Sequence, residues 1–159
     1  IAAWARVLRA LKAWEDIDCF RWSQQRRKAL FELAEKIPFN KLAFGHHMDD
    51  IAETILLNQF YRGETAAMKP KQELFDGKIT LIRPLAYERE ENMVTLAEKL
   101  NIQSIGGQSK CANDETSHRM KINAMLREFE KTNPQIIKNI FKSLQNIKTD
   151  YLLAQPKAV

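Results

Sequence analysis

The sequence has 159 residues, 45% of them hydrophobic, which is enough for one domain, or one domain and part of a second, with a buried core. Its formal net charge of +5 is compatible with nucleic acid binding but does not establish it. Two cysteines exclude a disulfide-stapled secreted scaffold, no apolar run approaches the roughly 18 residues that span a bilayer, and no signal-peptide pattern opens the chain, so we expect a cytoplasmic protein with no membrane partner.

The first predicted elements are two helices and a strand. Apolar residues recur every three or four positions over 1–14, which predicts an amphipathic helix. A second helix is predicted over 23–37, with Ser23 as its N-cap. A short strand over 40–45 follows.

The middle of the chain continues this alternation. Residues 49–62 predict a helix that Gly63 closes, because glycine readily takes the left-handed conformation at a helix end. Residues 64–77 are expected to form a polar loop. Alternating apolar residues over 78–85 predict a strand, and 88–101 predict another helix.

The last third is predicted to be mainly helical. Residues 102–105 are compatible with one more short strand, and 114–133 and 134–153 both predict helices. Helices that alternate with strands indicate an α/β fold with parallel strands. We therefore expect an α/β domain over 1–110 and a helical C-terminal extension over 111–159.

A cluster of polar residues lies between the predicted strand over 40–45 and the helix that follows it. In an open parallel sheet, ligands bind beyond the carboxyl ends of the strands, where this cluster is expected. Asp50 and Glu53 have the spacing of a capping box, so part of the cluster has a structural explanation. The rest exceeds what capping needs, and carboxylates and imidazoles can hold Mg²⁺ or a transition metal. The candidate residues are Gly45, His46, His47, Asp49, Asp50, Glu53 and Thr54.

This cluster belongs to a recognisable motif. The letters GHHMDDIAETILLN, residues 45–58, resemble the GHH-x-DD-x-x-ET signature of the PP-loop ATP pyrophosphatase superfamily. Four further stretches resemble the tRNA 2-thiocytidine biosynthesis protein family: CFRWSQQRRKAL, AMKPK, IRPLAYERE and NPQIIKNIFKSLQNIKTDYL. The resemblance runs from about Cys19 to Leu152. It implies a Rossmann-like adenine nucleotide alpha hydrolase (PP-loop) fold, here partial, with C-terminal helices.

The resemblance also implies a function, an ATP-dependent tRNA sulfurtransferase. Such proteins use ATP and Mg²⁺ to adenylate the C2 oxygen of a cytidine in the tRNA anticodon loop, release pyrophosphate, and replace the activated oxygen with sulfur. The sulfur comes from a cysteine desulfurase-like donor and passes through a [4Fe-4S] cluster, and family members are often homodimers.

The resemblance assigns roles to particular residues. Residues 26–28 are expected to contact RNA phosphates or the nucleotide, although a solvated helix face explains them equally well. Arg83 lies in the RPL segment, where a structural role and a ligand contact are both open. The implied roles are catalysis and magnesium binding for Asp49 and Asp50, nucleotide binding for Gly45, His46, His47, Glu53 and Thr54, RNA contact for Arg26, Arg27 and Lys28, and cluster binding for Cys19 and Cys111.

The sequence departs from the family pattern at several points. It contains no SGG-x-DS phosphate loop: its first glycine is Gly45, and we interpret the pair at 106–107 as a turn. The family's C-x-x-C reads CFRW, so Trp22 stands at the second cysteine position and two thiolates remain for a cluster usually held by three or four. The first residue is not Met, so we expect a processed, truncated or partial chain.

Three other functions remain open. Another PP-loop enzyme would make 2-thiouridine or lysidine, and lysidine formation needs no cluster. A metal-dependent phosphohydrolase would use the His and Asp residues, but the only other histidine, His118, is too little for a second metal-binding group. A non-catalytic RNA-binding fragment would retain RNA with a steep salt dependence and would not turn over ATP.

Overall fold

The computed structural model describes residues 19–36, 39–102 and 117–153, so the helix predicted over 1–14 lies outside the described residues. The first described element is α2 (Cys19–Lys36). It begins at Cys19 rather than at Ser23, because no helix-breaking residue stands between them. Ser23 is therefore not an N-cap, and its hydroxyl and carbonyl oxygens accept hydrogen bonds from Arg27 one turn later.

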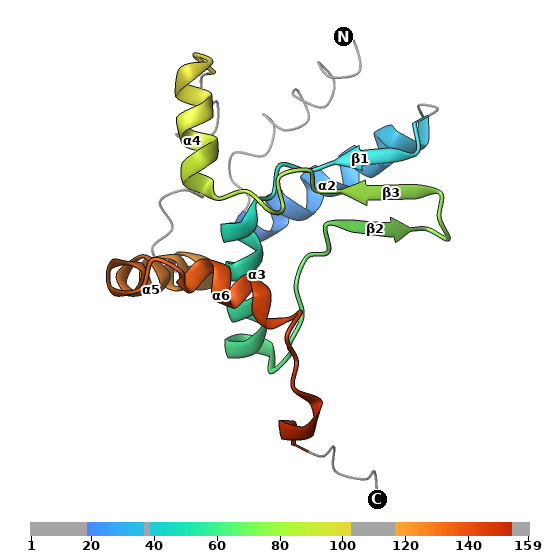
Figure 1. Cartoon of the computed structure of the whole chain (residues 1–159). Coiled ribbons are helices and arrows are strands. Elements are labelled where there is room, and N and C mark those ends of the chain that lie inside the picture. The colour runs from blue at the N-terminus through green and yellow to red at the C-terminus, as the bar shows by residue number, and fades with distance from the viewer. Residues whose placement is uncertain (1–18, 37–38, 103–116, 154–159) are drawn as a thin grey trace, which may run out of the picture.

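A three-stranded sheet lies beside α2 (Figure 1). Its strands are β1 (Lys41–Ala43), β2 (Lys71–Leu74) and β3 (Ile79–Ile82), in the order β1-β3-β2. β1 and β3 run parallel and are joined by a crossover that contains a helix, which confirms the predicted α/β fold with a parallel strand pair. The predicted alternation in β3 is also confirmed, because its first and third side chains are buried.

The polar loop predicted over 64–77 is wrong in its second half, where β2 pairs antiparallel with β3. The connection turns at Asp76-Gly77, whose φ angles are 54° and 83°, and Lys78 N–H donates to the Phe75 carbonyl over 3.1 Å. Positive φ at both central residues is what a type I′ hairpin turn requires, and Asp-Gly is its preferred sequence. That dipeptide is a signal from which the hairpin could have been predicted.

The core surrounds the central helix α3 (Met48–Arg62) (Figure 1). Gly63 ends α3 with φ of 65°, as predicted. Two helices, α5 (His118–Thr132) and α6 (Ile136–Ser143), pack against α3 and bury one cluster with it, while a second cluster forms around the segment after β3. The buried residues are Met48, Ala52, Ile122, Leu126 and Ile137 in the first cluster, and Ile51, Ile55 and Ala86 in the second.

The two C-terminal helices are shorter than predicted. α5 begins after Ser117, whose hydroxyl accepts a hydrogen bond from Met120 N–H over 3.2 Å, rather than at 114. α6 ends at Ser143, and only a 3-10 turn, η2 (Thr149–Tyr151), continues the predicted helical stretch. The side chain of Asn146 donates to the Lys142 carbonyl over 3.1 Å and so satisfies an acceptor that a longer helix would have used.

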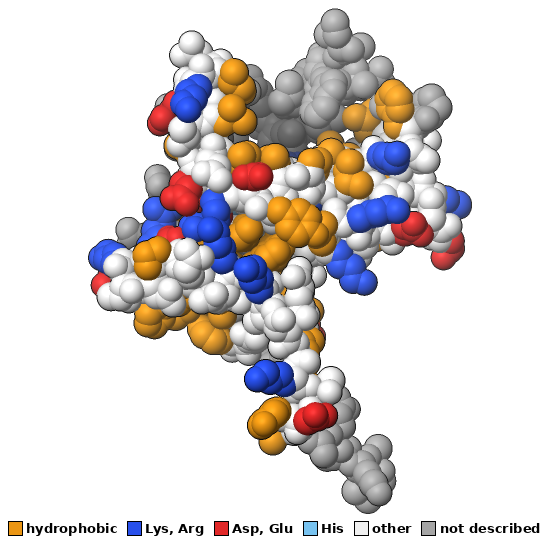
Figure 2. All heavy atoms as spheres, viewed as in Figure 1, with side chains coloured by type: hydrophobic (Ala, Val, Ile, Leu, Met, Phe, Trp, Pro, Cys, Tyr) orange, Lys and Arg blue, Asp and Glu red, His pale blue; other side chains and the backbone are white. Residues whose placement is uncertain are grey.

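The helix α4 (Glu90–Lys99) stands away from α3, α5 and α6 (Figure 1). None of its residues is buried, and hydrophobic side chains lie exposed along it (Figure 2). It begins and ends within two residues of its predicted bounds, 88–101. Most of the strand predicted over 102–105, and the domain boundary predicted at 110, lie outside the described residues, so both stay predictions. Within the part of the chain that the structure describes, no helix is long and apolar enough to cross a membrane.

Candidate functional site

The predicted polar cluster lies where β1 and β3 end and α3 begins. The two parallel strands end at the same edge, and the stretch after β1 leads directly into the first turn of α3. Gly45 has open space where a Cβ would stand, so nothing among the described residues demands glycine there. Thr54 lies one turn into α3, and its hydroxyl donates to the Asp50 carbonyl over 2.8 Å. The structure thus brings together, at one sheet edge, the predicted residues His46, His47, Asp49, Asp50 and Glu53.

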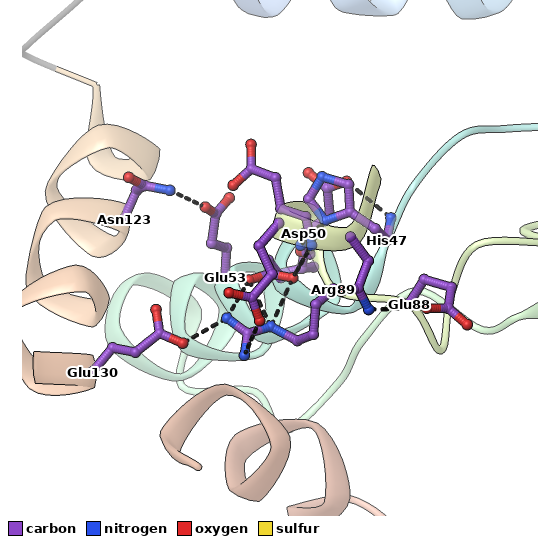
Figure 3. Close-up of polar contacts among 12 residues, drawn as sticks. His47, Asp50, Glu53, Glu88, Arg89, Asn123 and Glu130 are labelled. Atoms are coloured by element: carbon purple, nitrogen blue, oxygen red, sulfur yellow. Dashed lines mark hydrogen bonds and ion pairs between the residues drawn. The ribbon is translucent and has the colours of Figure 1, made fainter. Parts of the chain in front are cut away.

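The capping box of α3 involves different residues from those predicted. His47 is the N-cap: its Nδ1 accepts from Asp50 N–H over 3.4 Å, and Asp50 Oδ2 accepts from His47 N–H over 3.1 Å (Figure 3). The box predicted between Asp50 and Glu53 is therefore wrong. The helix α3 begins earlier than that box would place it, because Met48 N–H donates to the Glu88 carbonyl over 2.8 Å. This long-range contact fixes the chain at the first helical residue. Asp50 remains a member of a box, but as its third helical position.

Asp49 connects α3 to the start of α4. Its carboxylate is almost fully buried and accepts hydrogen bonds from Arg89 Nε over 3.1 and 3.3 Å. It also accepts from Glu90 N–H over 2.8 Å, at the first residue of α4, whose own N-cap provides no side-chain acceptor. Asp49 therefore caps a second helix from a distance and at the same time neutralises a buried guanidinium.

Arg89 is the centre of this network (Figure 3). Besides Asp49, it donates through Nη2 to Glu130 of α5 over 2.5 Å. Burial acts to lower the pKa of Arg89, but the hydrogen bonds and negative charges of Glu130 and Asp49 outweigh it, and the pKa is raised overall. One buried cation thus joins the starts of α3 and α4 to α5.

A second arginine holds the other two acids of α3. Arg119, in the first turn of α5, donates to Asp50 Oδ1 over 2.6 Å and to Glu53 Oε2 over 2.7 Å. Asn123, one turn further along α5, donates to Glu53 Oε1 over 2.6 Å (Figure 3). Glu53 is only 6% exposed, and both of its carboxylate oxygens are occupied by these donors.

A cleft of about 440 Å³ lies beside this network, between α3, α4 and α5. Its polar lining consists mainly of the network itself, and Val94, Leu126 and Ile137 add apolar surface. Acidic side chains outnumber basic ones along it. Its charged residues are Asp49, Glu53, Arg89, Glu90, Glu91, Arg127 and Glu130.

These carboxylates do not fit a directly bound magnesium ion as they lie. Each oxygen of Asp49, Asp50 and Glu53 accepts a hydrogen bond from the protein, and two guanidinium groups stand where a cation would approach. Among the described residues, no group of three or more His, Cys, Asp or Glu is arranged to hold a metal ion. We therefore assign no chemical step to magnesium, and its binding by Asp49 and Asp50 stays a prediction.

His46 lies on the other side of this edge, next to the residue that follows β3. Arg83 Nε donates to His46 Nδ1 over 3.3 Å. Burial lowers the pKa of His46 below its ordinary value of 6.5, and so do the charges of Arg83, Arg119 and Arg26, while Asp50 acts in the opposite direction. The lowered pKa and the hydrogen bond from Arg83 both favour the neutral imidazole of His46.

The residues predicted to contact RNA lie on α2. Arg26, Arg27 and Lys28 are all exposed. Arg27 donates to Ser23, and Lys28 lies 3.9 Å from Glu32, both within the helix. The structure presents these side chains to solvent, and their contact with RNA stays a prediction. Of the two residues predicted to hold a cluster, Cys19 is the first residue of α2. Cys111 lies outside the described residues, so cluster binding stays a prediction.

Sequence reasoning missed the partners of the acidic residues. The helical periodicity alone assigns no role to these partners, which are Arg89, Arg119, Asn123 and Glu130. They lie 40 to 70 positions from the groups that they bind, so no local spacing marks them. Arg83, for which the sequence left a structural role and a ligand contact open, lies directly after β3 at the sheet edge and binds His46.

Comparison with known proteins identifies related sequences. No family model matches the chain. The tRNA-cytidine(32) 2-sulfurtransferase of Vibrio campbellii is 42% identical over 134 residues, which cover 84% of this chain and 45% of the relative. The protein of the same name from Nitrosospira multiformis is 39% identical over 135 residues, covering 85% of this chain and 45% of the relative.

A solved structure is similar as well. The U34-tRNA thiolase NcsA from Methanococcus maripaludis, solved with its [4Fe-4S] cluster, superposes with a TM-score of 0.62 and covers 89% of this chain and 47% of that one. At 22% identity this similarity concerns the fold alone, and it agrees with the α/β prediction. The chain spans about half the length of the curated relatives it matches. By sequence, the chain therefore belongs among the homologues of the tRNA-cytidine(32) 2-sulfurtransferases.

Proposed function

We propose that the protein takes part in ATP-dependent thiolation of tRNA, forming 2-thiocytidine at position 32 of the anticodon loop. The observation that carries this proposal is 42% identity to a tRNA-cytidine(32) 2-sulfurtransferase over 84% of the chain. The protein's partners in this reaction are tRNA and a sulfur donor of the cysteine desulfurase type, in the cytoplasm where tRNA is modified. A homodimer is part of the same proposal.

The geometry supports a nucleotide site at the carboxyl ends of β1 and β3. Open parallel sheets bind ligands there, and the polar segment from His46 to Asp50 lies at this edge. In the proposed reaction, the cytidine C2 oxygen attacks the α-phosphorus of ATP and pyrophosphate leaves. Sulfur then replaces the activated oxygen and AMP leaves. Within this scheme, the residues of the edge bind and orient the nucleotide, since such a reaction depends on positioning and charge stabilisation.

The cofactors of the proposal are ATP, Mg²⁺ and a [4Fe-4S] cluster. The cluster would carry the transferred sulfur, with Cys19 and Cys111 as two of its ligands. Two thiolates are fewer than such clusters use, so a further ligand is required. The solved thiolase of similar fold contains a [4Fe-4S] cluster, which supports iron–sulfur chemistry in this fold.

The experiment is to express the gene product, as its native cell makes it, in a bacterium that lacks its own 2-thiocytidine enzyme. Total tRNA is then digested to nucleosides, which are separated by chromatography and identified by mass spectrometry. We expect 2-thiocytidine to appear. A rise of 2-thiouridine or lysidine instead would assign the protein to another branch of PP-loop enzymes. RNA binding with no modified nucleoside would favour a non-catalytic RNA-binding role.

A further inference from the structure

Arg83 is held rigidly at the end of β3. Its side chain is buried, with 8% of the residue exposed. Its backbone N–H donates to the Pro70 carbonyl over 2.8 Å, and its own carbonyl accepts from Ala86 N–H over 3.1 Å. Its Nη1 donates to the Lys69 carbonyl. Backbone and guanidinium are thus fixed by the segments on both sides of the hairpin, so the N–H of Nε has a defined direction.

That donor meets the imidazole of His46. Arg83 Nε lies 3.3 Å from His46 Nδ1. A guanidinium can only donate hydrogen bonds, so Nδ1 must offer its lone pair and carry no proton. A neutral imidazole has one N–H, which must then be on Nε2. The contact therefore selects one of the two tautomers of His46.

The surroundings of His46 restrict it further. The ring of Phe44 stands edge-on to the imidazole, with 5.4 Å between the centroids and 62° between the planes. Arg26 of α2, Arg83 after β3 and Arg119 of α5 place positive charge around the ring, and among the described residues Asp50 of α3 is the negative group that acts on it. These charges disfavour the protonated, positively charged imidazole and leave the neutral ring, which carries a single N–H, as the favoured form.

We propose that Arg83 is a positioning residue that holds His46 as the neutral Nε2–H tautomer, so that His46 donates a hydrogen bond to a phosphate oxygen bound at the carboxyl ends of β1 and β3. The identity of that phosphate rests on the proposed function, in which ATP and the tRNA backbone are the two sources. The tautomer itself rests only on the geometry.

The proposal has a consequence for metal binding. A histidine binds a metal through a ring nitrogen that carries no proton, and in His46 that nitrogen is Nδ1, which already accepts from Arg83. Binding through Nε2 would require the proton to move to Nδ1 and the hydrogen bond with Arg83 to break. The proposal therefore disfavours the metal-dependent phosphohydrolase, for which His46 would be a ligand.

The test is nuclear magnetic resonance of the native protein labelled with ¹⁵N-histidine, at a pH above 7. Long-range proton–nitrogen spectra distinguish the two neutral tautomers, and His46→Gln assigns the signals. We expect His46 in the wild type to show the pattern of a protonated Nε2. Arg83→Met should mix the tautomers, and Arg83→Lys should do the same while keeping a positive charge. A control, Arg127→Met, removes an exposed arginine of α5 and should leave the pattern unchanged.

Two results would overturn the proposal. One is a wild-type His46 that is charged or protonated on Nδ1, a result that does not depend on the folding of any variant. The other is a tautomer that stays fixed in a folded Arg83→Lys protein. Neither result depends on thiolation, so the proposed function can fail while the tautomer holds, and the reverse.

A second measurement identifies the phosphate. ATP without added metal and a tRNA anticodon stem-loop are titrated separately into the labelled wild-type protein. We expect the His46 Nε2 signal to shift with one of them, and the one that shifts it is the source. Binding of both without any shift of Nε2 would refute the donor role.

Discussion

Two charged clusters that the sequence marks for function are held in opposite ways. At the start of α3, Asp49, Asp50 and Glu53 are mostly buried. Apart from the N-cap His47, their partners come from 40 or more positions away in the sequence. On α2, residues 26–28 are exposed, and the contacts of Arg27 with Ser23 and of Lys28 with Glu32 stay within about one helical turn. Similar densities of charge are therefore held in two different ways.

The difference lies in what desolvation costs. A buried charge must be matched by a fixed partner, so the α3 cluster is part of what holds α3, α4 and α5 together. An exposed charge gains little from a neighbour and loses little without one. We infer that changes in the α3 cluster act first on stability, whereas changes on α2 leave the fold intact and act on binding.

The largest expected effect is that of Arg89→Met. It leaves Asp49 and Glu130 without their shared cation, and loss of one partner from a buried ion pair costs about 3 to 5 kcal/mol. Unfolding in urea, followed by circular dichroism, measures the free energy of unfolding. Arg127→Met is the matched control, because this arginine is 68% exposed, and its contacts with Glu90 at 3.7 Å and with Asn123 Oδ1 at 2.8 Å lie near the solvent.

We expect the Arg127→Met control to lose less than about 1 kcal/mol. Adding Asp49→Asn to Arg89→Met should restore part of the stability, because the uncompensated charge is then removed. Equal losses in the two single variants would show that Arg89 is not the centre of a buried network, and the contrast between the two regions would disappear.

A smaller effect is expected for Glu53→Gln. The amide keeps the shape of the side chain but replaces one acceptor oxygen by a donor, which then faces Arg119 or Asn123, so we expect a loss of about 1 to 3 kcal/mol. Glu128→Gln is the control: its pair with Lys131 joins side chains that are 71% and 69% exposed. The same unfolding measurement compares them, and a loss in Glu128→Gln as large as in Glu53→Gln would contradict the burial argument.

On α2, the triple change of Arg26, Arg27 and Lys28 to Gln should lower the free energy of unfolding by less than about 1 kcal/mol. Its effect is expected on tRNA instead: the slope of log affinity against log salt should become shallower by about 2 to 3, if each residue meets one phosphate. The control is the triple change of Lys99, Lys131 and Lys142 to Gln, which removes the same charge elsewhere. Equal slopes in the two triple variants would assign α2 a solvated face without RNA contact.

Local rules predicted the elements whose ends depend on local chemistry. Gly63 ends α3 as expected, and the alternation of β3 is seen in its buried residues. Where two local solutions compete, sequence alone chose wrongly: His47 rather than Asp50 caps α3, because a tertiary contact at Met48 fixes the start. The hairpin of β2 and β3 was not predicted, although the Asp76-Gly77 dipeptide is the preferred sequence of such a turn.

The candidate site was predictable in place but not in its contacts. The sheet edge followed from the strand–glycine–helix order, and the polar cluster lies there. The arginines that pair with its acidic residues could not be predicted in the same way. Arg89 is the N-cap of α4 and Arg119 lies in α5, both far from α3 in the sequence. The packing of α5 on α3, which depends on apolar residues spread over the chain, brings Arg119 to the site. The contact of Met48 N–H with the Glu88 carbonyl brings Arg89 there.

The smallest expected effect is the contribution of His46 to the pH dependence of the free energy of unfolding. Because its pKa in the folded protein lies below 6.5, the unfolded state binds the proton first as pH falls. The contribution of His46 to stability is therefore complete above pH 6.5 and is lost as pH falls through the lowered pKa. Urea unfolding of the wild type and His46→Gln between pH 5 and 7.5 should show a weaker loss in the variant. Parallel curves would mean that His46 titrates alike in the folded and unfolded states, and that burial and the surrounding charges together do not lower its pKa.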